Sequence, residues 1–232
     1  MIAIYRFMRI STPQGVWLAQ PLYLKREWIS HSAPLMMNSW MLTMMASSGV
    51  ILLKFLYPSE AVVGIYAVVA QTGTLIVLFA NTVNRLYLPL MSLFMERRDA
   101  ASMHHLMQHR LVVVGGLAGL FFCSIAVFGQ EVLAWFGPHF PDGYFALCIL
   151  AAGASISAMF SDAPYYLQFM KRTHNVFVTT MCAMILNLIF TTVLSYHMGL
   201  VGAACGYSIS MSLLFLIQRV QISRHPSLNV SS

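Results

Sequence analysis

The sequence predicts an all-α integral membrane protein, a bundle of six transmembrane helices. Of the 232 residues, 59% are apolar and only 9% are charged, whereas soluble domains carry about 25% charged residues. Apolar runs recur along the chain, and about 20 such residues in a helix cross the hydrocarbon core of a bilayer. So few polar residues cannot cover a water-facing surface, which argues against a soluble enzyme, and a disordered chain would contain few apolar residues.

Six apolar stretches have the required length. The first carries no charge before Lys54 and the second none before Arg85, whereas the fourth contains Asp162. The third, fifth and sixth contain no Asp, Glu, Lys or Arg. The predicted spans are 34–56, 61–93, 111–130, 144–168, 175–196 and 200–218. Helices of a soluble core would need polar faces to meet water, and these stretches have none.

The basic residues alternate along the predicted loops. All 13 Lys and Arg residues except Lys54 and Arg85 lie before the first span or after the second, fourth and sixth spans. The loops after the first, third and fifth spans contain no Lys or Arg. This positive-inside pattern predicts an even number of spans with both termini in the cytoplasm. Basic residues this sparse do not form a nucleic-acid surface, so we expect no nucleic-acid partner.

The chain is expected to have three parts. Residues 1–30 form a cytoplasmic N-terminal linker segment, residues 31–221 the six-helix transmembrane lobe, and residues 222–232 a cytoplasmic tail. Arg6 and Arg9 interrupt the apolar start of the chain, so we expect no cleaved signal peptide. Within the lobe, residues 95–108 combine charged and apolar residues and predict an interfacial helix.

Small residues and one proline predict how the helices pack. Gly115-x-x-x-Gly119 and Gly202-x-x-x-Gly206 have the spacing that lets helices approach closely, either within one bundle or between two copies. Pro89 near the end of the second span predicts a bend there. The four cysteines (Cys123, Cys148, Cys182 and Cys205) lie in apolar runs without Cys-x-x-Cys spacing and are expected to be small buried hydrophobic residues.

Candidate site residues are the polar side chains inside the spans: Arg85, Asp162, Lys54 and Asn84. Charges within a membrane are costly and usually face a bundle interior or a wet cavity. Arg85 lies about 12 Å and Asp162 about 9 Å from the inner ends of their helices. They could therefore share one inward-facing cavity as a pair. Alternatively, Arg85 could hold an anionic substrate group or extend to the interface, as we expect of Lys54 at the outer end.

The sequence lacks the motifs of several enzyme classes. It contains no Gly-x-x-x-x-Gly-Lys-Ser/Thr loop, no His-Glu-x-x-His and no Gly-x-Ser-x-Gly. His105 and His109 could share a helix face, but no third ligand lies beside them. We therefore expect no catalytic residues, no cofactor and no metal site. A transporter needs only a cavity and helices that move around it, which fits this sequence better than an enzyme.

Five segments resemble parts of one membrane protein family. Trp28-Ile-Ser-His-Ser-Ala-Pro34-Leu is similar to the start of the seventh helix of polysaccharide flippases, and Val63-Gly64-Ile-Tyr66-Ala67 to the start of their next helix. The remaining segments are Leu88-Pro89-Leu-Met-Ser92, Phe136-Gly137-Pro-His-Phe140 and Gly199-Leu-Val-Gly202-Ala203-Ala204. The chain thus resembles the C-terminal half of the multidrug/oligosaccharidyl-lipid/polysaccharide flippase superfamily, nearest its O-antigen and exopolysaccharide translocases.

The resemblance implies that an undecaprenyl-diphosphate-linked oligosaccharide crosses the bacterial inner membrane through a cavity between two six-helix lobes. This chain would supply one lobe, so its expected partners are the lipid-linked oligosaccharide, membrane lipids and a second lobe from another copy or a split partner. The chain could also be a truncated fragment. The alternatives are a cation-coupled multidrug exporter of the same fold, for which only Asp162 offers an intramembrane carboxylate, and an integral-membrane glycosyl or acyl transferase.

Overall fold

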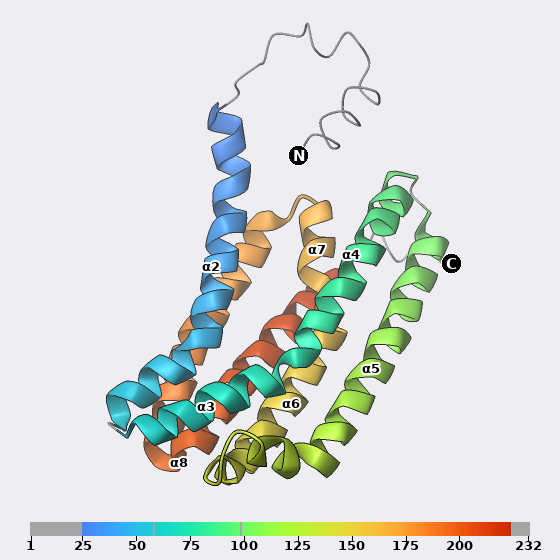
Figure 1. The fold of residues 1–232 in the computed structure, drawn as a ribbon. Helices are drawn as coiled ribbons and strands as arrows, with labels where there is room; N and C mark the ends of the chain where they lie inside the picture. Colours follow the sequence, from blue (N-terminus) through green and yellow to red (C-terminus); the bar gives the residue numbers. More distant parts are fainter. Residues whose placement is uncertain (1–24, 58, 98, 224–232) are drawn as a thin grey trace, which may run out of the picture. The chain divides into compact units, whose positions relative to one another are not determined.

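A computed structural model describes residues 25–57, 59–97 and 99–223. In these ranges the regular elements are all helices, which confirms the predicted all-α fold. In chain order they are α2 (Lys25–Leu56), α3 (Glu60–Gly73), α4 (Leu75–Glu96), α5 (Ala100–Ala134), the 3₁₀ helix η2 (Phe140–Gly143), α6 (Tyr144–Met159), α7 (Ala163–Phe169) and α8 (Thr173–Ser223) (Figure 1). Most of the predicted linker and of the predicted tail lies outside the described residues. The packing below is that within residues 34–223.

Five helical segments of the described chain are long and apolar enough to cross a membrane. They are Ser32–Leu56, Glu60–Glu96, Ala101–Ala134, Phe140–Phe169 and Thr173–Ile222. The first four each contain one predicted span. The last one, 50 residues long, contains both the fifth and the sixth predicted spans, so the difference from six lies entirely in α8.

The backbone of α8 reverses at Gly199. This residue has φ 59° and ψ −130°, a non-helical conformation that glycine adopts readily because it lacks a Cβ. On either side the chain packs against itself: a Cβ on Gly202 would collide with the carbonyl of Leu194, and one on Gly206 would lie 2.6 Å from the Cα of Thr191. Residues 173–198 and 200–223 are therefore two antiparallel arms of one hairpin.

The two glycine motifs differ in what surrounds them. Gly202 and Gly206 lie at the closest approach of the α8 arms, so the predicted close packing occurs here, within one chain. A Cβ on Gly119 would meet nothing within 4 Å, and one on Gly115 would touch only the Met159 methyl group at 3.4 Å. The first motif therefore makes no close helix contact in the described chain.

The second predicted span is broken, but at Thr74 rather than near Pro89. Thr74 separates α3 from α4, and its hydroxyl donates a 2.6 Å hydrogen bond to the carbonyl of Ala70, a bond that often bends helices. Next to it, a Cβ on Gly73 would lie 2.9 Å from the Leu150 side chain on α6. Pro89 lies inside α4, which continues to Glu96. The close contact with α6 thus decides where the chain turns.

The segment 95–108 does not form a separate helix. It is divided between the end of α4, a short connection and the first turns of α5. Asp99 caps α5, since its carboxylate accepts a 3.0 Å hydrogen bond from the Ser102 amide. The Ser102 side chain, and then its backbone amide, hold the pKa of Asp99 below its usual value by hydrogen bonding to the carboxylate. From there α5 runs for 35 residues, about 52 Å, so the third predicted span extends well beyond residues 111–130.

Burial is inverted relative to a water-soluble protein. Large apolar side chains such as Phe55, Leu78 and Val112 are more than 60% exposed, whereas Asn187 and Thr191 are fully buried. Helix α6 packs against α3, α4, α5 and α8 and contributes much of the largest apolar core cluster. The four cysteines are free, but contrary to expectation none is fully buried, and Cys123 and Cys182 are exposed on the apolar exterior.

Candidate functional site

The fourth predicted span is interrupted between α6 and α7. Pro164, in the first turn of α7, has no N–H to donate, and the Ala163 amide bonds to the carbonyl of Phe160 at 3.1 Å. The carbonyl of Met159, which this amide would bond in a continuous helix, is left for another donor. Asp162 lies in the interruption and is only 4% exposed. The break therefore places free carbonyls and a carboxylate inside the bundle.

Arg110 of α5 fills this break. Its guanidinium donates to the carbonyl of Met159 at 2.9 Å, to the hydroxyl of Ser161 at 2.9 Å and to the side-chain oxygen of Asn84 at 2.8 Å. Asn84 in turn donates to the Ser161 hydroxyl at 3.0 Å. Arg110 is 1% exposed. A buried guanidinium is tolerated because its donors are satisfied, and here they join α4, α5 and the α6–α7 break.

Asp162 pairs with two arginines. Its carboxylate lies 2.9 Å from the Arg110 guanidinium and 3.8 Å from that of Arg219, whose side chain is one-third exposed. We call Asn84, Arg110, Ser161, Asp162 and Arg219 the Arg110 cluster. With two arginines and one aspartate, the Arg110 cluster has a formal net charge of +1.

The structure brings two of the four predicted site residues together, Asn84 and Asp162. The hypothesis that Arg85 pairs with Asp162 is wrong, because Arg85 is exposed and Asp162 pairs with Arg110. The physical reason is helix geometry: neighbouring residues point about 100° apart, so Asn84 faces the Arg110 cluster and Arg85 faces away. Lys54 is exposed near the end of α2.

Arg110 is one of the basic residues that the sequence places in the loop after the second predicted span, because it precedes the third apolar stretch. A signal for its burial was present in the spacing of its neighbours. Met103, Met107, Val114 and Ala118 recur at helical spacing and are all buried. Arg110 falls on the same face, between Met107 and Val114, so the apolar pattern that continues through it marks it as an inward-facing residue.

The exposed face of α4 carries a short polar stripe of Asn81, Thr82 and Arg85. The buried face of the same helix is formed by Ile76, Ala80, Asn84 and Met91. Within the described residues Arg85 has no ion pair or hydrogen bond, and exposed leucines lie beside it along the helix. The stripe thus presents an unpaired cation on an otherwise apolar surface.

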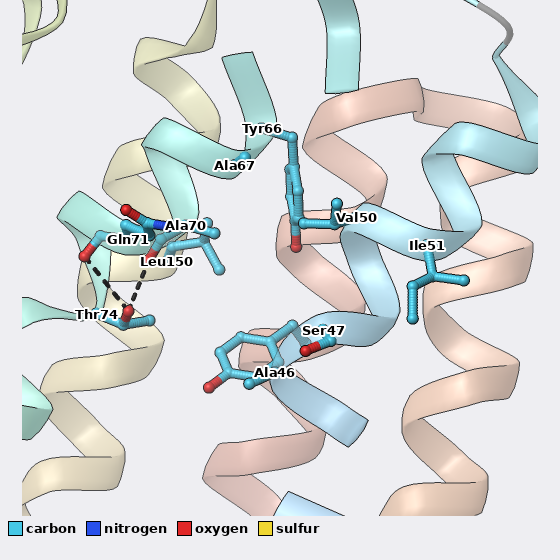
Figure 2. Close-up of a pocket in the computed structure, with 11 residues that line it drawn as sticks. Ala46, Ser47, Val50, Ile51, Tyr66, Ala67, Ala70, Gln71, Thr74 and Leu150 are labelled. Atoms are coloured by element: carbon cyan, nitrogen blue, oxygen red, sulfur yellow. Dashed lines mark hydrogen bonds between the residues drawn. The ribbon is translucent and has the colours of Figure 1, made fainter. Parts of the chain in front are cut away.

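A cavity of about 330 Å³ lies between α2, α3, α6 and α8. Its walls are apolar, with polar groups from Ser47, Tyr66, Gln71, Thr74 and Tyr207, and no charged side chain lines it. Figure 2 shows Tyr66 extending toward Val50, with Gln71 and Thr74 on another part of the wall. No residue of the Arg110 cluster lines this cavity.

Comparisons of the chain with protein-family models, curated proteins and solved structures found no match. The described residues contain no group of three or more His, Cys, Asp or Glu side chains placed to hold a metal ion. The functional assignment therefore rests on the geometry of the polar groups above.

Proposed function

We propose that this chain forms one six-helix lobe of a flippase for an undecaprenyl-diphosphate-linked oligosaccharide in a bacterial inner membrane. The exposed apolar exterior and the buried polar interior support a lipid environment. The reversal at Gly199 supports the count of six, since each arm of α8 is long enough to cross a bilayer. With the alternating basic loops, the proposed six spans predict that both termini are cytoplasmic.

Arg85 carries this proposal. It lies near the middle of α4, about 15 Å from either end, on the turn that also holds Asn84 and therefore at the depth of the buried Arg110 cluster. An unpaired guanidinium that faces hydrocarbon is costly, so such residues face a polar cavity or extend to the interface, and the proposal assigns Arg85 to a cavity. A second lobe over this face of α4 would enclose such a cavity. A diphosphate is a suitable occupant, because guanidinium groups bind phosphate oxygens in bidentate fashion.

Two interrupted helices support a transport role. The breaks at Thr74 and at Phe160–Asp162 divide the second and fourth predicted spans, and discontinuous helices are frequent in transporters, where segments move around a central site. In this chain the α6–α7 break is held by Arg110, so we assign the Arg110 cluster a structural role. Substrate contact is assigned to the opposite face of α4, which carries Arg85.

The alternative functions receive less support. A cation-coupled exporter needs a carboxylate that is free to bind the cation, but Asp162 is already paired with Arg110 and Arg219. A glycosyl or acyl transferase needs acid, base or nucleophilic groups gathered at one site. In the described residues the buried ionised groups form the Arg110 cluster, whose hydrogen bonds are already used within the bundle.

The proposal is tested by complementation of a strain that lacks its polysaccharide flippase, with surface polysaccharide as the readout. The wild-type chain is expected to restore the polymer, alone as a homodimer or with a co-expressed second lobe. Arg85→Ala should abolish restoration, and Arg85→Lys should restore it in part because it keeps the charge but loses the bidentate geometry. Arg97→Ala, which removes an exposed loop cation, is the matched control. Full restoration by Arg85→Ala would overturn the proposed substrate contact.

Topology is tested separately. Reporter tags inserted beside Arg97 and beside Lys171 should both report a cytoplasmic location, because both segments follow even-numbered spans. Tags at these two positions on opposite sides of the membrane would exclude the six-span arrangement, and with it the proposed lobe.

A further inference from the structure

Two buried tyrosines line the cavity between α2, α3, α6 and α8. Tyr66 is 2% exposed and Tyr207 is 9% exposed. Within the described residues neither hydroxyl has a hydrogen-bond partner, and neither is among the fully buried polar atoms that lack one, so both hydroxyls are accessible from the cavity. Tyrosine hydroxyls in such surroundings usually find a partner. The cavity therefore presents these groups to a molecule that enters it.

The backbone makes room for this arrangement. A Cβ on Gly49 of α2 would collide with the Tyr66 hydroxyl and with the ring edge that carries it, so a glycine at this position is what lets this end of Tyr66 lie against α2. Figure 2 shows the ring extending from its helix toward Val50. Packing against Gly49 thus fixes Tyr66, and Tyr207 lines the same, mostly apolar wall.

The polar groups of the wall offer both donors and acceptors. The tyrosine hydroxyls have hydrogens to donate. The hydroxyl of Thr74 already donates to the carbonyl of Ala70 at 2.6 Å, so toward the cavity it offers only lone pairs. The Gln71 amide can do both. A ligand whose own groups both donate and accept, such as a polyol, complements such a wall better than an ester or an ether, which only accept.

The charge and the size of the cavity further restrict which ligands can bind there. None of the described residues that line the cavity is charged, so a phosphate would enter it without a counter-ion from these residues. Its volume of about 330 Å³ is at the lower end of the range of about 300–1,000 Å³ for small-molecule sites. This size suits one ring rather than an extended oligosaccharide. The apolar walls suit the C–H faces of a sugar ring, and the hydroxyl groups suit its edge.

We infer that this cavity is a subsite for one neutral sugar ring of an amphiphilic glycolipid, separate from the Arg85 face that we assign to the diphosphate. This inference rests on the proposed function for the identity of the lipid carrier. It adds that Tyr66 and Tyr207 contact the saccharide. A hydroxyl-bearing head group could also come from the glycerol of an ordinary membrane lipid, and the experiment separates these two sources.

The test measures binding by the full chain in phosphatidylcholine nanodiscs. The probe is octyl β-glucoside with a photoreactive diazirine on its alkyl chain, and labelled peptides are mapped by mass spectrometry. We expect labelling within 46–51 and 66–74, with competition by unmodified octyl glucoside and not by octyl glycerol, octyl phosphate or octanol. Equal competition by octyl glycerol would assign the cavity to membrane lipid, and equal competition by octyl phosphate or octanol would show no sugar recognition. Each of these results overturns the inference.

Variants test the two hydroxyl groups. The double variant Tyr66→Phe/Tyr207→Phe keeps both rings and should weaken glucoside binding about tenfold, as expected for the loss of two hydrogen bonds. Tyr144→Phe is the matched control, because its hydroxyl bonds the Ala126 carbonyl at 2.8 Å and does not line the cavity. Ala67→Leu keeps both hydroxyls but fills the cavity, and should also abolish labelling. Unchanged binding in a folded double variant, as judged by circular dichroism, would overturn the assignment.

This experiment and the complementation test can fail independently. A chain that binds the glucoside as described but does not restore the polymer would keep the sugar subsite and reject the proposed flippase. A chain that restores the polymer but shows no competition between the probe and octyl glucoside would keep the flippase and reject the subsite.

Discussion

Replacing Arg110 with methionine is expected to destabilise the fold by about 3–5 kcal/mol, the cost of breaking a buried ion pair from one side. The substitution leaves Asp162 buried with only the more distant Arg219, at 3.8 Å. It also removes the donor to the Met159 carbonyl at 2.9 Å, and an unsatisfied buried group contributes about 1–3 kcal/mol of such a cost. The free energy of unfolding can be measured by sodium dodecyl sulfate titration, followed by circular dichroism.

A double-mutant cycle sharpens this prediction. Asp162→Asn alone should cost less, about 1–3 kcal/mol, because Arg110 keeps its bonds to Asn84, Met159 and Ser161. Added to Arg110→Met, the same substitution should recover stability, because no buried charge then remains without a close partner. The magnitude of the coupling should therefore exceed the cost of Asp162→Asn alone, and we expect about 2–3 kcal/mol.

Arg85→Met is the matched control for stability, since Arg85 is exposed and has no ion pair within the described residues. It should not lower the free energy of unfolding, because it breaks no ion pair or hydrogen bond within the described residues. The reasoning would be refuted if Arg110→Met cost less than about 1 kcal/mol, as for a surface pair, or if Asp162→Asn destabilised the Arg110→Met variant further.

Three further predictions follow from the helix ends and the α8 hairpin. Gly202→Ala should destabilise the chain by about 1–3 kcal/mol in the same titration, because its Cβ would collide with the Leu194 carbonyl. Gly119→Ala is the control and should not destabilise the chain, because there is open space around Gly119. Equal effects of the two substitutions would contradict the hairpin. Gly199→Ala should cost about 1–3 kcal/mol through backbone strain at φ 59°, and an unchanged midpoint would argue against the reversal. The hydrogen bond by which Asp99 caps α5 should persist above the ordinary pKa of a carboxyl group and weaken as the pH falls through the lowered pKa of Asp99. Faster amide hydrogen exchange at Ser102 would report the loss of this bond. Asp99→Ala should remove the pH dependence of that exchange.

Much of the helical fold could be predicted from the sequence because helix formation in apolar stretches depends on local composition. The described spans cover the six apolar stretches, and the Gly199–Gly202 region carries the glycines that its reversal requires. Positions that depend on contacts between helices were predicted less well. The break at Thr74 coincides with the contact of Gly73 against α6, and nothing in the local sequence distinguishes it from Pro89 as a place to bend.

The sequence alone determined that this chain consists of apolar helices joined by loops that alternately contain and lack Lys and Arg, since each of these properties is set by residues close together in the chain. Only the tertiary structure decided that Asp162 pairs with Arg110, that Arg85 has no ion pair within the described part of the chain, and that two tyrosines line one cavity. The physical reason is that a buried charge or hydroxyl selects its partner by depth and by direction around the helix. Those coordinates exist only once α4, α5, α6 and α8 have packed together.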